Sequence, residues 1–138
     1  MIAYLGIGTN LGDRTANLRC AVDRINEQAG HVLACSSFME TEPWGFTSDN
    51  AFLNAVVKVD TPHSPYELLH ITQKIEREMG RAHKSINGNY TDRIIDIDIL
   101  LYGDESINEP DLIIPHPMMW QRSFVYEPLW EIAPHLKP

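Results

Sequence analysis

Hydrophobic residues recur with two different periods along this chain, and the two periods predict strands and helices in alternation. Apolar residues at every second position are typical of a half-buried strand, whereas spacings of three and four are typical of one helix face. Helical spacing is found at 18–29, which Gly30 ends, and at 64–80, which Ser64 begins. Strands are predicted at 1–8, 32–39, 51–60 and 94–102.

The predicted elements follow the order β-α-β-β-α-β, which is the order of the ferredoxin-like fold. We therefore expect the α+β class, with a ferredoxin-like βαββαβ core and short C-terminal additions. The additions are a strand-like piece at 113–115, a short helix after His116 and a helix near 127–132. The 138 residues contain no internal repeat, low-complexity stretch or linker, so we expect a single domain over 1–138.

Two aspartates in the strand 94–102 are the most informative feature of the sequence. Asp96 and Asp98 are two positions apart, so both side chains point to one face, while the alternating isoleucines point to the other face and toward the helices. Neighbouring carboxylates repel each other, and a divalent cation such as Mg²⁺ would compensate their charge. An ordinary amphipathic strand with a solvated acidic face would give the same pattern, so both interpretations stay open here.

A cluster of basic side chains precedes these aspartates in a chain that is otherwise acidic. It flanks a polar loop whose Gly and Asn content suits closure over a ligand. Cationic side chains next to metal-binding carboxylates are what phosphoryl transfer requires, although a helix dipole also explains the cluster members nearest the helix end. The cluster consists of Arg77, Arg81, His83, Lys84 and Arg93.

Three further motifs are candidates for ligand contact. Phe52 and Asn54 share one face of the strand 51–60, where a ring beside an amide suits a flat heterocycle, or equally a cross-strand packing pair. The glycines of 6–12 miss the dinucleotide-binding spacing by one position and are interpreted as a turn. His116 lies between two prolines, where it either faces a ligand or is structural.

Composition restricts the partners of the chain. Lys and Arg number 11 against 19 Asp and Glu, and the net charge of −8 argues against binding to duplex DNA or RNA. No apolar run approaches the ~20 residues that span a bilayer, and we find no signal peptide. Cys20 and Cys35 form no metal or redox motif, which indicates a reducing compartment. We expect a cytoplasmic monomer that acts on small molecules, with no nucleic acid and no membrane as partner.

Several short motifs occur together and in order along nearly the whole chain. The most specific is Arg93-x-x-Asp96-x-Asp98-Ile99 followed by Pro115-His116. The others are 4–11, 52–55, 73–76, Gly80-Arg81, Arg122, Phe124 and Pro128-Leu129. As a set, they resemble the 6-hydroxymethyl-7,8-dihydropterin pyrophosphokinase family.

The resemblance implies Mg-dependent transfer of pyrophosphate from ATP to 6-hydroxymethyl-7,8-dihydropterin, with release of AMP, in folate biosynthesis. It implies two Mg²⁺ ions held by Asp96 and Asp98, which form the catalytic set together with Arg81 and Arg93. The implied pterin-binding residues are Thr41, Glu42, Trp44, Phe52, Asn54 and Phe124. The implied ATP-binding residues are Gln73, Arg81, His83, Arg93, Ile99, His116 and Arg122.

Two other functions stay open when the residues alone are considered. A non-catalytic ferredoxin-like binding module would have solvated aspartates and no dependence on magnesium. Another magnesium-dependent nucleotidyl or phosphoryl transferase would share the carboxylate pair but lack the platform of Phe52, Asn54 and Phe124. No residue stands out as the general base; Asp96 is a candidate, although a bound metal would lower its basicity.

Overall fold

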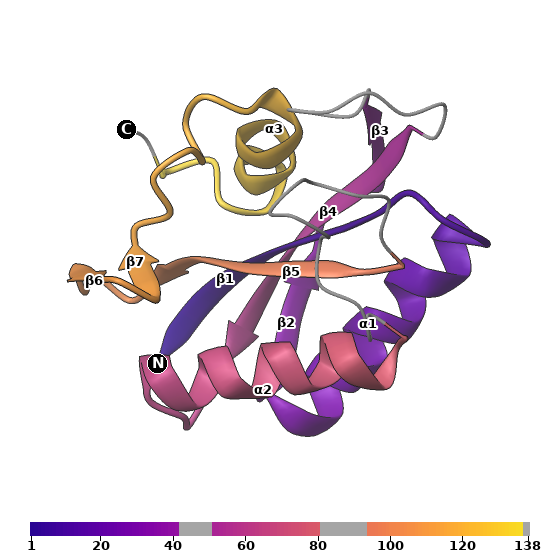
Figure 1. Cartoon of the computed structure of the whole chain (residues 1–138). Coiled ribbons are helices and arrows are strands. Elements are labelled where there is room, and N and C mark those ends of the chain that lie inside the picture. The colour runs from indigo at the N-terminus through magenta and orange to yellow at the C-terminus, as the bar shows by residue number, and fades with distance from the viewer. Residues whose placement is uncertain (42–50, 81–93, 137–138) are drawn as a thin grey trace.

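The structure is a computed structural model that describes residues 1–41, 51–80 and 94–136, and its main feature is an antiparallel sheet with helices on both faces (Figure 1). The helices are α1 (Arg14–Gln28), α2 (Pro65–Glu78) and α3 (Ser123–Ile132). The strands are β1 (Ile2–Thr9), β2 (His31–Cys35), β3 (Met39–Thr41), β4 (Phe52–Asp60), β5 (Asp96–Tyr102), β6 (Ile107–Glu109) and β7 (Leu112–Ile114).

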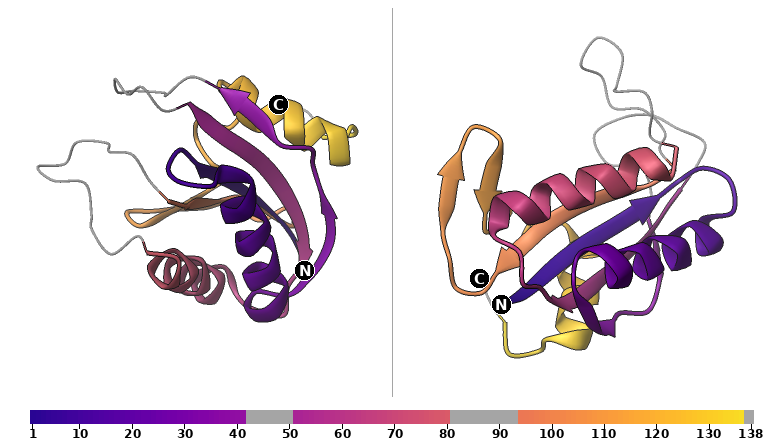
Figure 2. Two further views of the ribbon diagram at one scale, coloured as in Figure 1. Left: turned by 90° about the vertical axis from the view of Figure 1, so that its right-hand side faces the viewer. Right: turned by 90° about the horizontal axis from the view of Figure 1, so that it is seen from below.

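The connections between strands give the sheet its ferredoxin-like topology. The strand order is β2-β4-β1-β5, with β3 also paired to β4, while β6 and β7 form a separate hairpin. Helix α1 connects β1 to β2, and α2 connects β4 to β5. Both helices return to the same face of the sheet, and α3 lies on the opposite face (Figures 1 and 2). The predicted α+β class and ferredoxin-like core are confirmed.

Local signals in the sequence explain where the two long helices begin. The Asp13 carboxylate accepts a hydrogen bond from the Ala16 N–H at 3.1 Å and caps α1. Ser64 and Glu67 form a reciprocal capping box at the start of α2, each side chain accepting the other's backbone N–H. Such caps stabilise a helix by about 1 kcal/mol each. None of the helices in the described ranges is long and apolar enough to cross a membrane.

The alternation along the central strands divides the buried residues into two cores. Side chains at odd positions of β1, of β4 and of β5 as far as Ile99, such as Leu5, Val57 and Ile97, pack against α1 and α2 in the larger core. Side chains at even positions face the other way, and three of them form the smaller core beneath α3. The members of the smaller core are Tyr4, Val56, Leu100, Met119, Val125, Leu129 and Ala133. Both faces of the sheet are therefore used, and α3 covers the second face at Tyr4, Val56 and Leu100.

Three predicted elements differ from those in the structure. The predicted strand 32–39 is two strands, β2 and β3, because the Ser36 hydroxyl accepts the Val56 N–H at 2.9 Å and interrupts the backbone ladder. The segment after His116 forms turns, and helix α3 begins at Ser123 rather than near 127. A three-residue strand and a short helix carry too few periodic positions to be predicted with their bounds.

The strand predicted at 1–8 and the turn predicted over 6–12 overlap at Gly6 and Gly8, and the structure confirms the strand for both glycines. Gly6 and Gly8 lie inside β1, and the chain leaves the sheet after Thr9. The strand pattern around them is apolar, so the backbone continues through both glycines, paired to β4 on one side and β5 on the other. The glycines consequently contribute to the surface of the sheet and not to a loop.

Candidate active site

Three strands bring small and polar residues side by side on the second face of the sheet. Asn54 of β4, Gly8 of β1 and Asp96 of β5 are neighbours in register, and Gly6 pairs with Asp98 one step along. Because glycine has no side chain, nothing rises from the sheet between the amide and the two carboxylates. We call these five residues the floor.

Gly8 is required by the position of the Asn54 side chain. A Cβ atom at Gly8 would lie 2.9 Å from Asn54 Oδ1 and 3.6 Å from Phe52 Cδ1. The first distance is shorter than a carbon and an oxygen tolerate, so any larger residue would displace the amide. A Cβ at Gly6 would instead meet the Leu100 side chain at an ordinary contact distance of 3.4 Å. A side chain at position 8 would therefore displace the Asn54 amide, whereas a methyl group at position 6 would fit.

Hydrogen bonds to β3 fix the orientation of the Asn54 amide. Its Nδ2 donates to the Met39 carbonyl at 3.3 Å and to Thr41 Oγ1 at 3.1 Å. The side-chain oxygen is thereby turned toward Gly8. Asn54 is buried, and Phe52 lies two positions earlier on the same face, opposite Thr41 in the pairing of β3 with β4. The floor thus carries a fixed hydrogen-bond acceptor beside an aromatic ring.

Asp96 and Asp98 lie on the strand at one edge of the sheet, as the sequence predicts. Both carboxylates are half-buried, whereas Ile97 and Ile99 of the same strand are in the larger core. In the described ranges, no group of three or more His, Cys, Asp or Glu side chains could hold a metal ion by itself. Two carboxylates nevertheless fit Mg²⁺, which proteins commonly bind through one or two carboxylates together with substrate phosphates.

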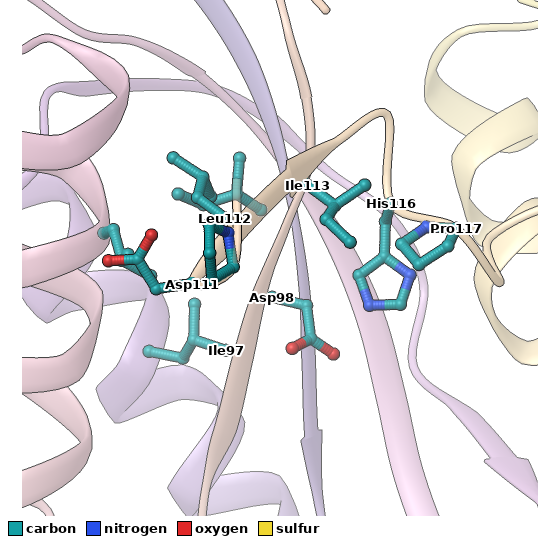
Figure 3. A pocket seen from close by; sticks show the side chains of 10 residues that line it. Ile97, Asp98, Asp111, Leu112, Ile113, His116 and Pro117 are labelled. Carbon is teal, nitrogen blue, oxygen red and sulfur yellow. The ribbon is translucent and has the colours of Figure 1, made fainter. Parts of the chain in front are cut away.

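A cleft of about 260 Å³ lies at the free edge of β5. Seven of its ten lining residues are apolar, and its polar side chains are Asp98, Asp111 and His116. Figure 3 shows Asp98 and His116 on one side of β5, with Ile97 and Asp111 on the other. The remaining wall comes from α2 and from the β6–β7 hairpin. The lining residues are Leu69, Ile97, Asp98, Ile99, Pro110, Asp111, Leu112, Ile113, His116 and Pro117.

Backbone and ring contacts hold His116 at this cleft. The His116 N–H donates to the Leu100 carbonyl of β5 at 2.9 Å, and the ring Nδ1 accepts the Met118 N–H at 3.2 Å. Burial lowers the pKa of His116 below its ordinary value, and the nearby positive charge of Arg122 lowers it further, while Asp96 acts in the opposite direction. The ring is therefore neutral near pH 7 and, with Nδ1 already accepting, carries its proton on Nε2.

The other predicted site residues that the structure describes lie at the cleft or near the smaller core. Ile99 lines the cleft, and Gln73 is exposed one helical turn after the lining residue Leu69. Arg122 precedes α3, and its guanidinium carbon lies 5.9 Å from the centre of the Phe124 ring, which packs against the smaller core. These placements are compatible with the predicted roles and do not test them.

Five predicted site residues lie outside the described residues. They belong to the two segments 42–50 and 81–93, and their roles stay predictions from the sequence. The five are Glu42, Trp44, Arg81, His83 and Arg93.

Some site features were missed by the sequence interpretation. Gly8 was not assigned a role in the site, and the hairpin residues Leu112 and Ile113 were not expected to line a cleft. Two glycines at alternate positions of a strand could have indicated a flat surface, since both point to one face. The hairpin gives no comparable signal, because each of its strands has only three residues.

Comparison with known proteins identifies the family to which the chain belongs. Residues 4–134 match the model of the family 7,8-dihydro-6-hydroxymethylpterin-pyrophosphokinase (HPPK). The 2-amino-4-hydroxy-6-hydroxymethyldihydropteridine pyrophosphokinase of Porphyromonas gingivalis is 51% identical over 138 residues, which cover 99% of this chain and 94% of that protein. The enzyme of the same name from Bacillus subtilis is 43% identical, over 96% of this chain and 78% of its own.

Solved structures resemble the fold at lower sequence identity. The crystal structure of Plasmodium falciparum HPPK-DHPS A437G with SDX-DHP superposes with a TM-score of 0.76 at 19% identity and covers 99% of this chain. This chain spans 42% of that longer chain. The likeness shows that the fold is shared.

The floor geometry predicts that Gly8→Ala displaces the Asn54 amide. The added methyl group overlaps Asn54 Oδ1, so the hydrogen bonds from Nδ2 to Met39 and Thr41 must stretch or break. We expect the Asn54 side-chain NH₂ signals to move clearly in a ¹⁵N–¹H correlation spectrum. Gly6→Ala, on the same strand and face, is the matched control and should leave these signals nearly in place. Equal shifts in both variants would contradict the assigned role of Gly8.

The environment of His116 predicts a pH-dependent contribution to stability. The lowered pKa means that the unfolded chain takes up this proton first, near pH 6.5, so acidification favours the unfolded state. The free energy of unfolding of the wild type, minus that of His116→Gln, should therefore fall as the pH drops from about 7 through this range. Urea unfolding at several pH values measures the difference, with His135→Gln as control. A difference that is flat or that rises on acidification would contradict the assignment.

Proposed function

The chain belongs to the 7,8-dihydro-6-hydroxymethylpterin-pyrophosphokinase family and is a pyrophosphokinase of folate biosynthesis, and from this premise we propose how its substrates are bound. The pterin lies on the floor, ATP occupies the cleft at the edge of β5, and magnesium lies between them at Asp96 and Asp98. The reaction forms a bond from the hydroxymethyl oxygen to the β-phosphorus. It breaks the bond between that phosphorus and the oxygen that bridges it to the α-phosphorus. AMP leaves with that oxygen, and the hydroxyl proton passes to a phosphate oxygen or to solvent.

One observation carries this arrangement. Asp98 lines the cleft, and Asp96, two residues earlier on the same face of β5, is in register with Gly8 and Asn54. The carboxylate pair therefore lies where the cleft and the floor meet. A group transferred from a ligand in the cleft to a ligand on the floor must pass these two side chains.

The cleft suits the nucleoside part of ATP. Its apolar walls provide a surface for a purine, and its volume of about 260 Å³ is too small to enclose a whole nucleoside triphosphate with its three phosphates. Typical ligand pockets measure roughly 300–1,000 Å³. We infer that the nucleoside enters the cleft and that the triphosphate extends past His116 and Asp98 toward the floor. The neutral His116 ring then donates from Nε2 to a phosphate oxygen.

The floor suits a flat heterocycle that has N–H groups on its edge. Asn54 uses both Nδ2 contacts within the protein and directs an oxygen acceptor over the floor. The glycines at 6 and 8 leave room for a planar ring to lie close to the sheet. Phe52 supplies an aromatic surface on the same face, and we infer that Phe124 supplies a second one.

The donor set at Asp96 and Asp98 fits magnesium. When bound, Mg²⁺ ions neutralise charge on the triphosphate and favour attack at phosphorus. We propose two such ions, with the two carboxylates as the protein ligands and phosphate oxygens as the others. The chain itself fixes the separation and direction of the carboxylates, because β5 is held in the sheet through its pairing with β1.

The positive charges that face the transferred group are assigned to side chains whose roles are predicted from the sequence. We propose that Arg81 and Arg93 contact the transferred group and stabilise its negative charge, as phosphoryl transfer requires. His83, Gln73, Ile99 and Arg122 complete the ATP site, and Thr41, Glu42 and Trp44 complete the pterin site. Catalysis then rests on alignment and charge stabilisation.

We also infer that the protein acts in the cytoplasm as a monomer on small molecules. The two cysteines, Cys20 and Cys35, are free, which suits a reducing compartment. The net charge of −8 favours small substrates held in a local basic site over nucleic acid.

The activity is tested by an AMP-release assay with ATP, Mg²⁺ and 6-hydroxymethyl-7,8-dihydropterin. We expect AMP that requires both the pterin and the metal and that disappears with EDTA. Asp98→Asn should lower kcat by about 100-fold or more, because one ligand of the metal pair loses its charge. Asp104→Asn, an exposed aspartate in the turn after β5, is the control and should keep wild-type activity. Release of ADP would refute pyrophosphoryl transfer, and wild-type turnover in Asp98→Asn would refute the metal site.

The substrate assignment predicts separate effects on the two ligands. Asn54→Leu removes the acceptor above the floor and should raise the pterin Kd by about 100-fold, since a polar site discriminates strongly when a partner is lost. The Kd for ATP should change less than about twofold, because Asn54 does not line the cleft. Lys58→Ala, on the same face of β4 but at its far end, is the control. Calorimetric titration with each ligand measures both constants, and unchanged pterin affinity in Asn54→Leu would overturn the assignment.

A further inference from the structure

Glu76 is a carboxylate at a position of α2 where packing alone favours an apolar side chain. The buried stripe of the helix consists of Leu68, Thr72, Ile75 and Glu76, and Glu76 is 9% exposed. Burying a carboxylate costs free energy unless hydrogen bonds or opposite charges compensate it. The residue therefore indicates a purpose other than filling the space between α2 and the sheet.

The contact made by Glu76 identifies that purpose. Its Oε2 accepts a hydrogen bond from the Ile97 backbone N–H at 2.8 Å. Ile97 lies between Asp96 and Asp98, and it is in β5, the edge strand of the sheet. The hydrogen bond thus reaches the backbone at the midpoint of the carboxylate pair. A hydrogen bond to a charged acceptor is shorter and stronger than one between neutral groups.

The two edges of β5 are held by different partners at this point. On one edge the strand pairs with β1, with Asp96 opposite Gly8 and Asp98 opposite Gly6. On the other edge none of the described strands pairs with β5, and the Glu76 side chain takes the place of a neighbouring strand at Ile97. The backbone that carries both aspartates is consequently fixed from two sides.

We propose that Glu76 is a positioning residue for the metal site, acting through the Ile97 N–H to set the direction of Asp96 and Asp98. The proposal rests on the proposed function of the two aspartates. It assigns the effect to hydrogen-bond acceptance by the side chain of residue 76. A glutamine at this position keeps an acceptor of the same length, whereas a methionine keeps the approximate size and leaves the Ile97 N–H without this partner.

The experiment compares Glu76→Gln and Glu76→Met with the wild-type enzyme. The readouts are kcat, the Mg²⁺ concentration for half-maximal activity, the pterin Kd and the melting temperature. Glu78→Gln is the control, because Glu78 lies on the same helix but contacts Arg24, Gln28 and Lys74 and not β5. Assays are run at least 15 °C below the melting temperature of the least stable variant, so that loss of fold does not enter kcat.

We expect Glu76→Met to lower kcat or raise the half-maximal Mg²⁺ concentration by about 10- to 100-fold, as is usual when a partner behind a metal ligand is removed. Glu76→Gln should recover most of this loss. The pterin Kd should stay within about twofold in both variants, since Asn54 is held by β3. Glu78→Gln should keep the wild-type Mg²⁺ dependence.

Three results would overturn the proposal. A lower melting temperature in Glu76→Met with unchanged kcat and Mg²⁺ dependence would make Glu76 purely structural. Equal losses in Glu76→Gln and Glu76→Met would show that charge, and not hydrogen-bond acceptance, is what the site requires. A parallel loss of pterin affinity would place the effect outside the metal site. An inactive wild type would instead refute the proposed function, so the two failures are distinguishable.

Discussion

Two carboxylates at alternate positions of one strand repel each other, and the surrounding structure holds them at a fixed spacing in spite of this repulsion. Asp96 and Asp98 are held about 7 Å apart along β5 by the repeat of an extended strand. The opposite face of that strand is anchored by Ile97 and Ile99 in the larger core, so the strand cannot rotate to separate the charges. In the proposed function, a cation between the two substrates would relieve this repulsion and would link the fold to its chemistry.

One face of the sheet carries both the smaller core and the floor. Helix α3 covers the part of this face that carries Tyr4, Val56 and Leu100. The neighbouring part has glycine in place of apolar side chains at positions 6 and 8. Gly8 is in register with the polar residues Asn54 and Asp96, whereas Gly6 is in register with Asp98 on one side and with Val56 of the smaller core on the other. The same alternation that builds two cores thus also builds the floor, and the change from core to site takes place within single strands.

Much of this arrangement could be predicted from the sequence. The faces of 51–60 and 94–102 follow from the alternation of side chains, so Asn54 and the two aspartates are assigned correctly to the face opposite the larger core. The position of Asn54 relative to the two aspartates could not be predicted in this way. It depends on the register of β1 with β4 and β5, and a hydrophobic pattern does not specify which strands pair. Strand β3 was missed for a related reason: three residues contain too little periodicity, and yet they orient the Asn54 amide.

The residues that sequence reasoning failed to find act through contacts distant in sequence. Glu76 lies 21 positions from Ile97, and in the sequence it is one acidic residue on a helix that has several. The wall of the cleft formed by Leu112 and Ile113 depends on a short hairpin folding back toward β5. Family resemblance predicts which residues act in the reaction, and the structure shows how the backbone places the described ones among them, such as Asn54, Asp96 and Asp98, on one face of the sheet.

The most direct test of the central claim is to locate the metal. Mn²⁺, bound with a non-hydrolysable ATP analogue, broadens ¹⁵N–¹H signals of nearby backbone groups in solution. We expect strong broadening at Gly6, Gly8 and Ile97 and little effect on Leu33 of β2 or Trp130 of α3. Broadening concentrated at Glu109 and Asp111 of the hairpin, with sharp signals at Gly6 and Gly8, would contradict it.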